Sequence, residues 1–174
     1  FSVTEGTVYV EYQVSNLAGI GKIAFTIGAN SSNSVYLRGL NVGTGKAQLI
    51  VVDGGSSQAF PESIGSPAAN VLQKVAIVYK ANDFAISLNG ETPVTDTAGT
   101  VPGFSNELDI GHLNGSNFLN GHIAVIKYWN VRRASPLMQS ITAGLMEVLG
   151  GMWAALVGEP EAINDNAEPM RVAA

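Results

Sequence analysis

Hydrophobic and polar residues alternate one by one near the start of the chain. Between residues 7 and 14, one side of the pattern consists of Val8, Val10, Tyr12 and Val14. Successive side chains of a strand point to opposite faces, so this period of two predicts a strand with one face in a core. Similar short runs follow. We interpret as strands the ranges 23–27, 35–38, 47–52, 74–80, 84–88, 93–97, 108–110 and 122–129.

Turn residues separate these runs. Asn-Gly pairs stand at 89–90, 114–115 and 120–121, and Asp53 precedes two glycines. Such pairs tolerate the positive φ angles that tight type I′ hairpins require. Many short strands with turn signals between them are typical of an all-β protein, so we predict a two-sheet antiparallel jelly-roll sandwich.

The last predicted strand, 122–129, changes phase along its length. Its apolar residues are Ile123 and Val125 at first, and then Ile126 and Tyr128. A plain strand would keep one period of two, so this shift predicts a β-bulge.

A C-terminal helix is predicted after this strand. Ser135 is a good N-cap, and Pro136 suits the first helical position because no N–H is needed there. Leu137, Ile141 and Leu145 then form an apolar stripe at helical spacing, which predicts the buried face of the helix.

Composition limits the classes of function. The 174 residues are 46% hydrophobic and 13% charged, which favours one folded domain. The net charge is −5 and only nine basic residues are present, so we expect no nucleic-acid partner. Without cysteine, disulfides and thiolate metal sites are excluded. The chain shows no signal-peptide pattern, and its start at Phe1 in place of Met suggests a processed polypeptide or a part of a longer one.

The second half of the sequence resembles a known family. The pieces that carry the resemblance are the hairpin 79–84, Leu88-Asn89-Gly90, and the closing segment 119–123 followed by Tyr128 and Arg132-Arg133. They are similar to the concanavalin A-like, laminin-G-like jelly-roll module of tailed-bacteriophage virion proteins of the head spike fibre or tail fibre type. The resemblance spans Glu5 to about Thr142. In the family an acidic residue stands in the segment where this chain has 134–139, which contains proline instead.

The resemblance implies two curved antiparallel sheets with the first and last strands adjacent. It also implies a noncatalytic structural component of the virion, present in several copies and in contact with other virion proteins. Binding of a host-surface polysaccharide would fit this role, and a decoration protein without a ligand is the alternative. We therefore expect a jelly roll over 1–142, and over 143–174 a helix and arm used for packing or assembly.

Loop residues offer candidates for glycan binding. Sugars are bound by amide and carboxylate hydrogen bonds together with an aromatic ring, and Phe118 supplies such a ring in the loop 112–118. Asn, Ser and Gly are also ordinary turn residues, so the alternative is a purely structural role. The candidate ligand-binding residues are Asp53, Asn89, Asp109, His112, Asn114 and Asn117.

A paired carboxylate is the main argument for an enzyme. Glu107 and Asp109 lie two apart on a predicted strand, so their side chains would point the same way about 7 Å apart, as in glycosidases. The pair resembles part of the acid cluster of glucanases with this fold, but Gly111 and His112 stand where the third acid of that cluster would be expected. Neither histidine, His112 or His122, has partners at the spacing of a triad or a zinc site. We expect no catalysis, with a glycan-cleaving enzyme as the remaining alternative.

No cofactor is expected, and no dedicated metal motif is present. Calcium accepts scattered oxygen ligands, so a structural calcium ion is the alternative. Its ligands would come from Asp53, Asp83, Asp96 and Asp109.

The segment 140–158 is apolar on nearly every side. Its uninterrupted part contains Glu147 and a pair of glycines and is short for a membrane span, so we expect it to pack against protein. The predicted assembly residues are Leu145, Leu149, Met152, Trp153 and Leu156. The acidic, proline-containing end of the chain, 159–174, is expected to be a loose extension.

Overall fold

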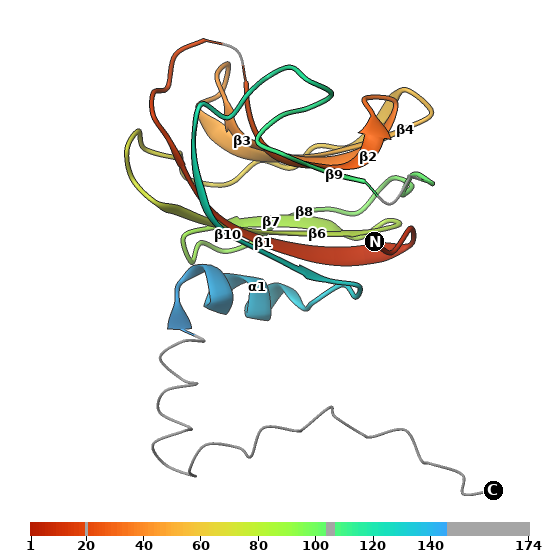
Figure 1. The fold of residues 1–174 in the computed structure, drawn as a ribbon. Helices are drawn as coiled ribbons and strands as arrows, with labels where there is room; N and C mark the ends of the chain where they lie inside the picture. The colour runs from red at the N-terminus through yellow and green to blue at the C-terminus, as the bar shows by residue number, and fades with distance from the viewer. Residues whose placement is uncertain (20, 104–106, 146–174) are drawn as a thin grey trace, which may run out of the picture.

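Two five-stranded antiparallel sheets pack face to face in the computed structural model, which describes residues 1–19, 21–103 and 107–145 (Figure 1). Their orders are β10-β1-β6-β7-β8 and β5-β4-β3-β2-β9. The predicted jelly roll is confirmed. The strands are β1 Glu5–Val14, β2 Lys22–Asn30, β3 Asn33–Asn41, β4 Lys46–Asp53, β5 Ser56–Ala59, β6 Gln73–Lys80, β7 Phe84–Leu88, β8 Val94–Asp96, β9 Leu108–Ile110 and β10 Gly121–Trp129, and the helix α1 is Ser135–Thr142.

The main core lies between the sheets and follows from the alternation of apolar residues. The predicted inner face of β1 is fully buried there, against Phe25 and Leu37 of the second sheet. The other face of β1 is buried as well, at Thr7 and Tyr9, because α1 and the segment before it cover this side of the first sheet (Figure 1). The first sheet is therefore covered on both faces.

β1 pairs with β10 on one side and with β6 on the other, so the first and last strands are neighbours as expected. The register between β1 and β10 shifts where Glu11 faces Val125 and Tyr12 faces Ile123, which leaves Ala124 as the extra residue. The predicted bulge is confirmed. Because of it, Ile123 packs on the core between the sheets, whereas Val125 points to the side covered by α1.

Most of the predicted turns have the expected backbone. Both residues have positive φ angles in the glycine pair 54–55 and in the Asn-Gly pairs 89–90 and 114–115. At the third Asn-Gly pair, only Asn120 is in the left-handed region, with a φ of 51°. Gly121 already belongs to β10, and close approach of the neighbouring strand makes glycine necessary there.

Replacing Gly121 with alanine should destabilise the fold. The added Cβ would collide with the carbonyl oxygen of Gln13, so the β1–β10 ladder must shift. We expect a loss of about 2 kcal/mol or more, measured by urea unfolding. The matched control is Gly103→Ala, whose Cβ meets nothing within 4 Å and should change nothing. Equal unfolding midpoints for the two variants would contradict this account.

The helix begins one residue earlier than predicted. Ala134 is the N-cap and makes no side-chain cap hydrogen bond, while Ser135 is already helical. The expected N-cap role of Ser135 is therefore wrong. The physical reason is that the Ser135 hydroxyl accepts a hydrogen bond from the Arg132 guanidinium at 3.2 Å.

The buried face of α1 also differs from the predicted stripe. Met138 and Thr142 are the buried residues, and Ile141 of the predicted stripe packs half-buried against the same cluster as Met138. Leu145 lies beyond the helix with 51% of its surface exposed. The Thr142 hydroxyl accepts from the backbone N–H of Gly90 at 3.0 Å, and Gln139 donates to the carbonyl of the same glycine at 3.0 Å. These contacts fix the rotation of the helix and turn Thr142 towards the first sheet.

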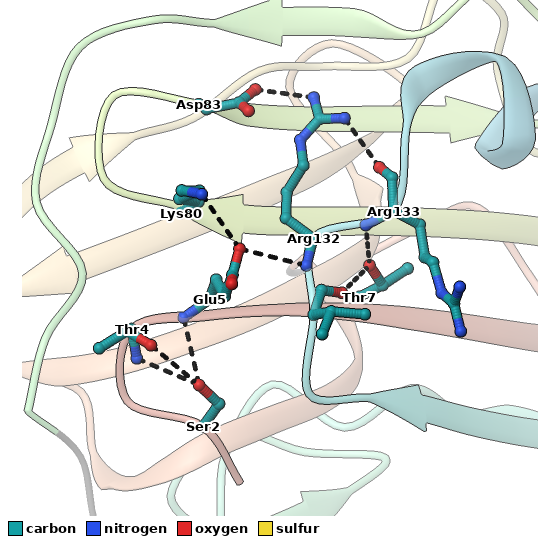
Figure 2. Close-up of polar contacts among 9 residues, drawn as sticks. Ser2, Thr4, Glu5, Thr7, Lys80, Asp83, Arg132 and Arg133 are labelled. Atoms are coloured by element: carbon teal, nitrogen blue, oxygen red, sulfur yellow. Dashed lines mark hydrogen bonds and ion pairs between the residues drawn. The ribbon is translucent and has the colours of Figure 1, made fainter.

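The segment between β10 and α1 is joined to β1 by hydrogen bonds (Figure 2). The Thr7 hydroxyl donates to the carbonyl of Val131 at 2.7 Å and accepts from the backbone N–H of Arg133 at 2.8 Å. The carboxylate of Glu5 accepts from the backbone N–H of Arg132 at 3.4 Å. β1 thus determines where the chain leaves the first sheet.

The guanidinium of Arg132 connects the same segment to the turn between β6 and β7 (Figure 2). It donates to Asp83 at 2.7 Å and to the carbonyl of Arg133 at 2.7 Å, and it also reaches Ser135. The Arg132 side chain is 14% exposed and that of Asp83 is 45% exposed, so the guanidinium is largely shielded from water while the carboxylate remains partly hydrated.

Arg132→Met should loosen α1. The change removes hydrogen bonds to a charged group, which are worth about 1.5–3 kcal/mol each, and should lower the free energy of unfolding by about 2 kcal/mol. The amides of α1 should also exchange faster with deuterated solvent. Lys80→Met is the control, because it breaks only the exposed pair with Glu5 at 3.3 Å and should cost less than about 1 kcal/mol. Unchanged exchange in α1 would contradict the role of Arg132.

Candidate functional site

The outer face of the second sheet carries the candidate site. β3 alternates so that Val35 and Leu37 enter the core, while Ser34, Tyr36 and Arg38 take the outer face. An apolar cluster lies there, and the loop 111–119 covers part of it from the side away from the first sheet (Figure 1). The cluster consists of Ile23, Tyr36, Ile50, Val52 and Leu113.

The loop 111–119 is attached to β2. The backbone N–H of Ile23 donates to the carbonyl of Asn117 at 3.1 Å, and the Thr26 hydroxyl donates to the carbonyl of His112 at 3.0 Å. Phe118 forms an isolated β-bridge with Ile23 of β2, and 58% of the surface of Phe118 is exposed. An aromatic ring is therefore held at the surface beside the sheet.

Polar groups lie beside this ring. The His112 ring contacts Phe118 edge to face, with centroids 5.9 Å apart, and its Nδ1 accepts from the backbone N–H of Gly115 at 3.2 Å. A neutral ring in this position carries its proton on Nε2. Asp109 lies 3.6 Å from the same Nδ1. The ring, the imidazole and the carboxylate offer stacking, donor and acceptor groups together.

A hydrogen-bonded network borders the other side of the face. The Arg38 Nη1 donates to the side-chain oxygen of Gln48 at 2.9 Å, and Asn41 donates to the same oxygen at 3.3 Å. Asn41 also donates to Glu62 at 2.7 Å, as does the hydroxyl of Thr44 at 2.8 Å.

Four of the six predicted ligand-binding residues come together at β9 and the following loop: Asp109, His112, Asn114 and Asn117. The other two lie elsewhere. Asp53 ends β4 and accepts from the Thr100 hydroxyl at 2.6 Å. Asn89 follows β7 in the first sheet, where it accepts from the backbone of Lys74 and donates to Gln73, both at 2.8 Å.

Sequence reasoning missed the contribution of β3 and β4 to this face. Tyr36, Arg38 and Gln48 were assigned to strands and not considered as site residues. The available signal was the polar side of the alternation in these two strands, since Val35 and Leu37 define the inner side.

The acids proposed for catalysis or calcium binding have separate surroundings. Glu107 is exposed and Asp109 lies beside His112. Asp83 binds Arg132, and Asp96 accepts from the backbone of Ala98 at 3.2 Å. Within residues 1–19, 21–103 and 107–145, no three His, Cys, Asp or Glu side chains form a group that could hold a metal ion. His122, on β10, is exposed.

The predicted assembly residues are described only in part. Leu145 is exposed just after α1, while Leu149, Met152, Trp153 and Leu156 lie outside the described residues. Among the helices of the described part, none is long and apolar enough to cross a membrane.

No protein-family model and no curated protein matches the sequence. Several solved structures are similar to this chain. The leech intramolecular trans-sialidase gives a TM-score of 0.64 at 17% identity over 82% of this chain and 24% of its own, so this chain spans about a quarter of that enzyme.

Two smaller structures match over more of their own length. The Ruminococcus gnavus IT-sialidase CBM40 bound to α2,3-sialyllactose has a TM-score of 0.61 at 11% identity, over 81% of this chain and 84% of its own. Domain 4 of a GH43 arabinanase from Geobacillus stearothermophilus, in complex with arabinotriose, has a TM-score of 0.61 at 12% identity, over 82% of this chain and 68% of its own. These likenesses show the jelly-roll fold, and none of the three is a phage virion protein.

Alkaline pH should destabilise the protein through its buried tyrosines. Burial raises the pKa of Tyr36 above its usual 10.0, against the opposing effect of Arg38, and burial also raises the pKa of Tyr12 and of Tyr79. A pKa that is higher in the folded than in the unfolded state gives stability that is complete below about pH 10 and lost above it. The free energy of unfolding should fall above pH 10 by up to about 1.4 kcal/mol per pH unit for each such tyrosine.

Urea unfolding at a series of alkaline pH values measures this loss, and Tyr36→Phe should make it shallower because one titrating group is removed. Equal phenolate absorbance in the folded and unfolded protein at the same alkaline pH would contradict the raised pKa values of the buried tyrosines.

Proposed function

We propose that this chain is a noncatalytic glycan-binding jelly roll. The observation that carries the proposal is Phe118, an exposed ring held at the outer face of the second sheet with His112 and Asp109 beside it. Aromatic rings stack on the apolar faces of sugars, while carboxylate and imidazole groups bind the hydroxyls. Carbohydrate-binding neighbours of the same fold support this proposal.

We further propose that the protein acts as a structural component of a phage-type virion. The support is the sequence resemblance of the closing segment and of the hairpin 79–84 to virion jelly rolls. Several copies on one particle would convert weak contacts with host-surface polysaccharide into strong attachment, because the second binding event is intramolecular. The exposed Leu145 beside α1 is a candidate contact with other virion proteins.

Phe118→Ala should weaken glycan binding at least about tenfold, because the stacking surface is lost. The purified chain is applied to an array of bacterial and plant oligosaccharides, and the affinity for each bound glycan is then measured by calorimetry. Leu145→Ala is the control, since it shortens a similarly exposed apolar side chain near α1 and should leave the affinity unchanged. Equal affinities for the wild type and Phe118→Ala would remove Phe118 from the site.

A second experiment tests the virion role by cosedimentation. The chain is mixed with intact host cells, with host cells stripped of surface polysaccharide, and with particles that lack the protein. Saturable binding to intact cells that disappears after stripping would support attachment. Binding to the depleted particles alone would identify a decoration protein and would contradict attachment to the host surface.

A further inference from the structure

Among the residues that the structure describes, two basic side chains near Gly19 and Gly21 form no ion pair. Lys22 is only 7% exposed, and among the described residues its ammonium group forms no ion pair. It lies 3.7 Å from the position that a Cβ would take on Gly19. Arg38 packs more closely on Gly21, where its Nε is 2.9 Å from the corresponding position.

The hydrogen bonding of Arg38 is incomplete. Its Nη1 donates to a neutral amide, that of Gln48, and its Nε is buried with no partner in the described part of the chain. A buried donor without an acceptor is costly and requires an explanation. The carboxylate of Glu62 is close to this network, but it accepts from Asn41 and Thr44 instead.

This arrangement is unusual for an acidic chain. The protein has 14 acidic and nine basic residues, so carboxylates are in excess. Basic residues are seldom buried without a partner, since the loss of hydration must be compensated. The excess of acids nevertheless leaves the buried Lys22 and the buried Nε of Arg38 without an acidic partner among the described residues, which indicates an anion-binding position at this end of the second sheet.

The register of the sheet places this position next to the aromatic ring. Ile23 pairs with Arg38 of β3 on one side and bridges to Phe118 on the other, and Lys22 directly precedes it. A ligand at this end of the sheet would therefore meet the ring on one side and the guanidinium on the other.

We infer that the glycan bound by this face carries a carboxylate, which Lys22 and Arg38 recognise. The inference rests on the proposed glycan-binding function. A guanidinium presents several N–H donors in a plane that matches a carboxylate, and an ammonium group adds a compact positive charge. The ligand class is thus an acidic oligosaccharide, of the kind that contains uronic or sialic acids.

Matched pairs of acidic and neutral sugars test this. Trigalacturonic acid and 3′-sialyllactose are each compared with their methyl esters, which keep the sugar rings and remove the charge. The wild type should bind at least one acid about tenfold or more tightly than its ester, and added salt should reduce this preference. Arg38→Gln and Lys22→Met should each abolish most of the preference while binding of the ester is retained.

Lys127→Met is the matched control. It removes one positive charge from β10 in the other sheet and should leave the preference unchanged. Thermal unfolding of each variant checks its fold. Should Arg38→Gln fail to fold, Arg38→Lys keeps the charge without the planar fork and should lose part of the preference.

Three results would overturn the inference. They are equal binding of every acid and its ester, a preference that survives in both Lys22→Met and Arg38→Gln, and an equal loss of preference in Lys127→Met. In all three, glycan binding itself would still stand. Failure of the wild type to bind any acid, any ester or any neutral glycan of the array would instead remove the proposed function together with the inference.

Discussion

The antiparallel pairing of β1 with both β10 and β6 is the interaction on which the rest of the structure depends. It brings the two ends of the jelly roll into one sheet and sets the bulge at Ala124, which turns successive apolar residues of β10 to opposite faces. It also places Thr7 and Glu5 where they bind the segment leading to α1. The helix therefore covers the first sheet because β1 determines where β10 ends.

The two sheets use their outer faces differently. The outer face of the first sheet is covered by α1, whose Met138 belongs to the buried cluster there. The outer face of the second sheet is covered only in part, by the loop 111–119. This loop holds Phe118 at the surface and places polar groups beside the apolar cluster. One face thus provides stability, and the other exposes an aromatic ring beside polar and charged side chains.

Much of the fold could be predicted because alternation and turn residues are local signals. The bulge of β10 was visible as a change of phase, and the glycine pair 54–55 as a hairpin. β5 was missed because Ser56–Ala59 has almost no apolar character. The buried face of α1 was misassigned because Thr142 is polar, and only the structure shows its hydroxyl bound to Gly90. Nor could the sequence reveal that the buried Nε of Arg38 has no hydrogen-bond partner among the described residues, since that depends on contacts between distant strands.

The central place of β1 has a consequence for how the protein forms during synthesis. Of the strands of the jelly roll, β1 leaves the ribosome first and its partner β10 last. Until then one edge of β1 has free backbone donors and acceptors, and such edges can pair with other chains. Long-range pairing of this kind is also slow, because the chain loses the entropy of closing a long loop before the stabilising contacts between the strands form. Nascent chains on one messenger would therefore be most prone to pair with each other just before residue 121 is made, and a slow completion of the first sheet is built into the topology.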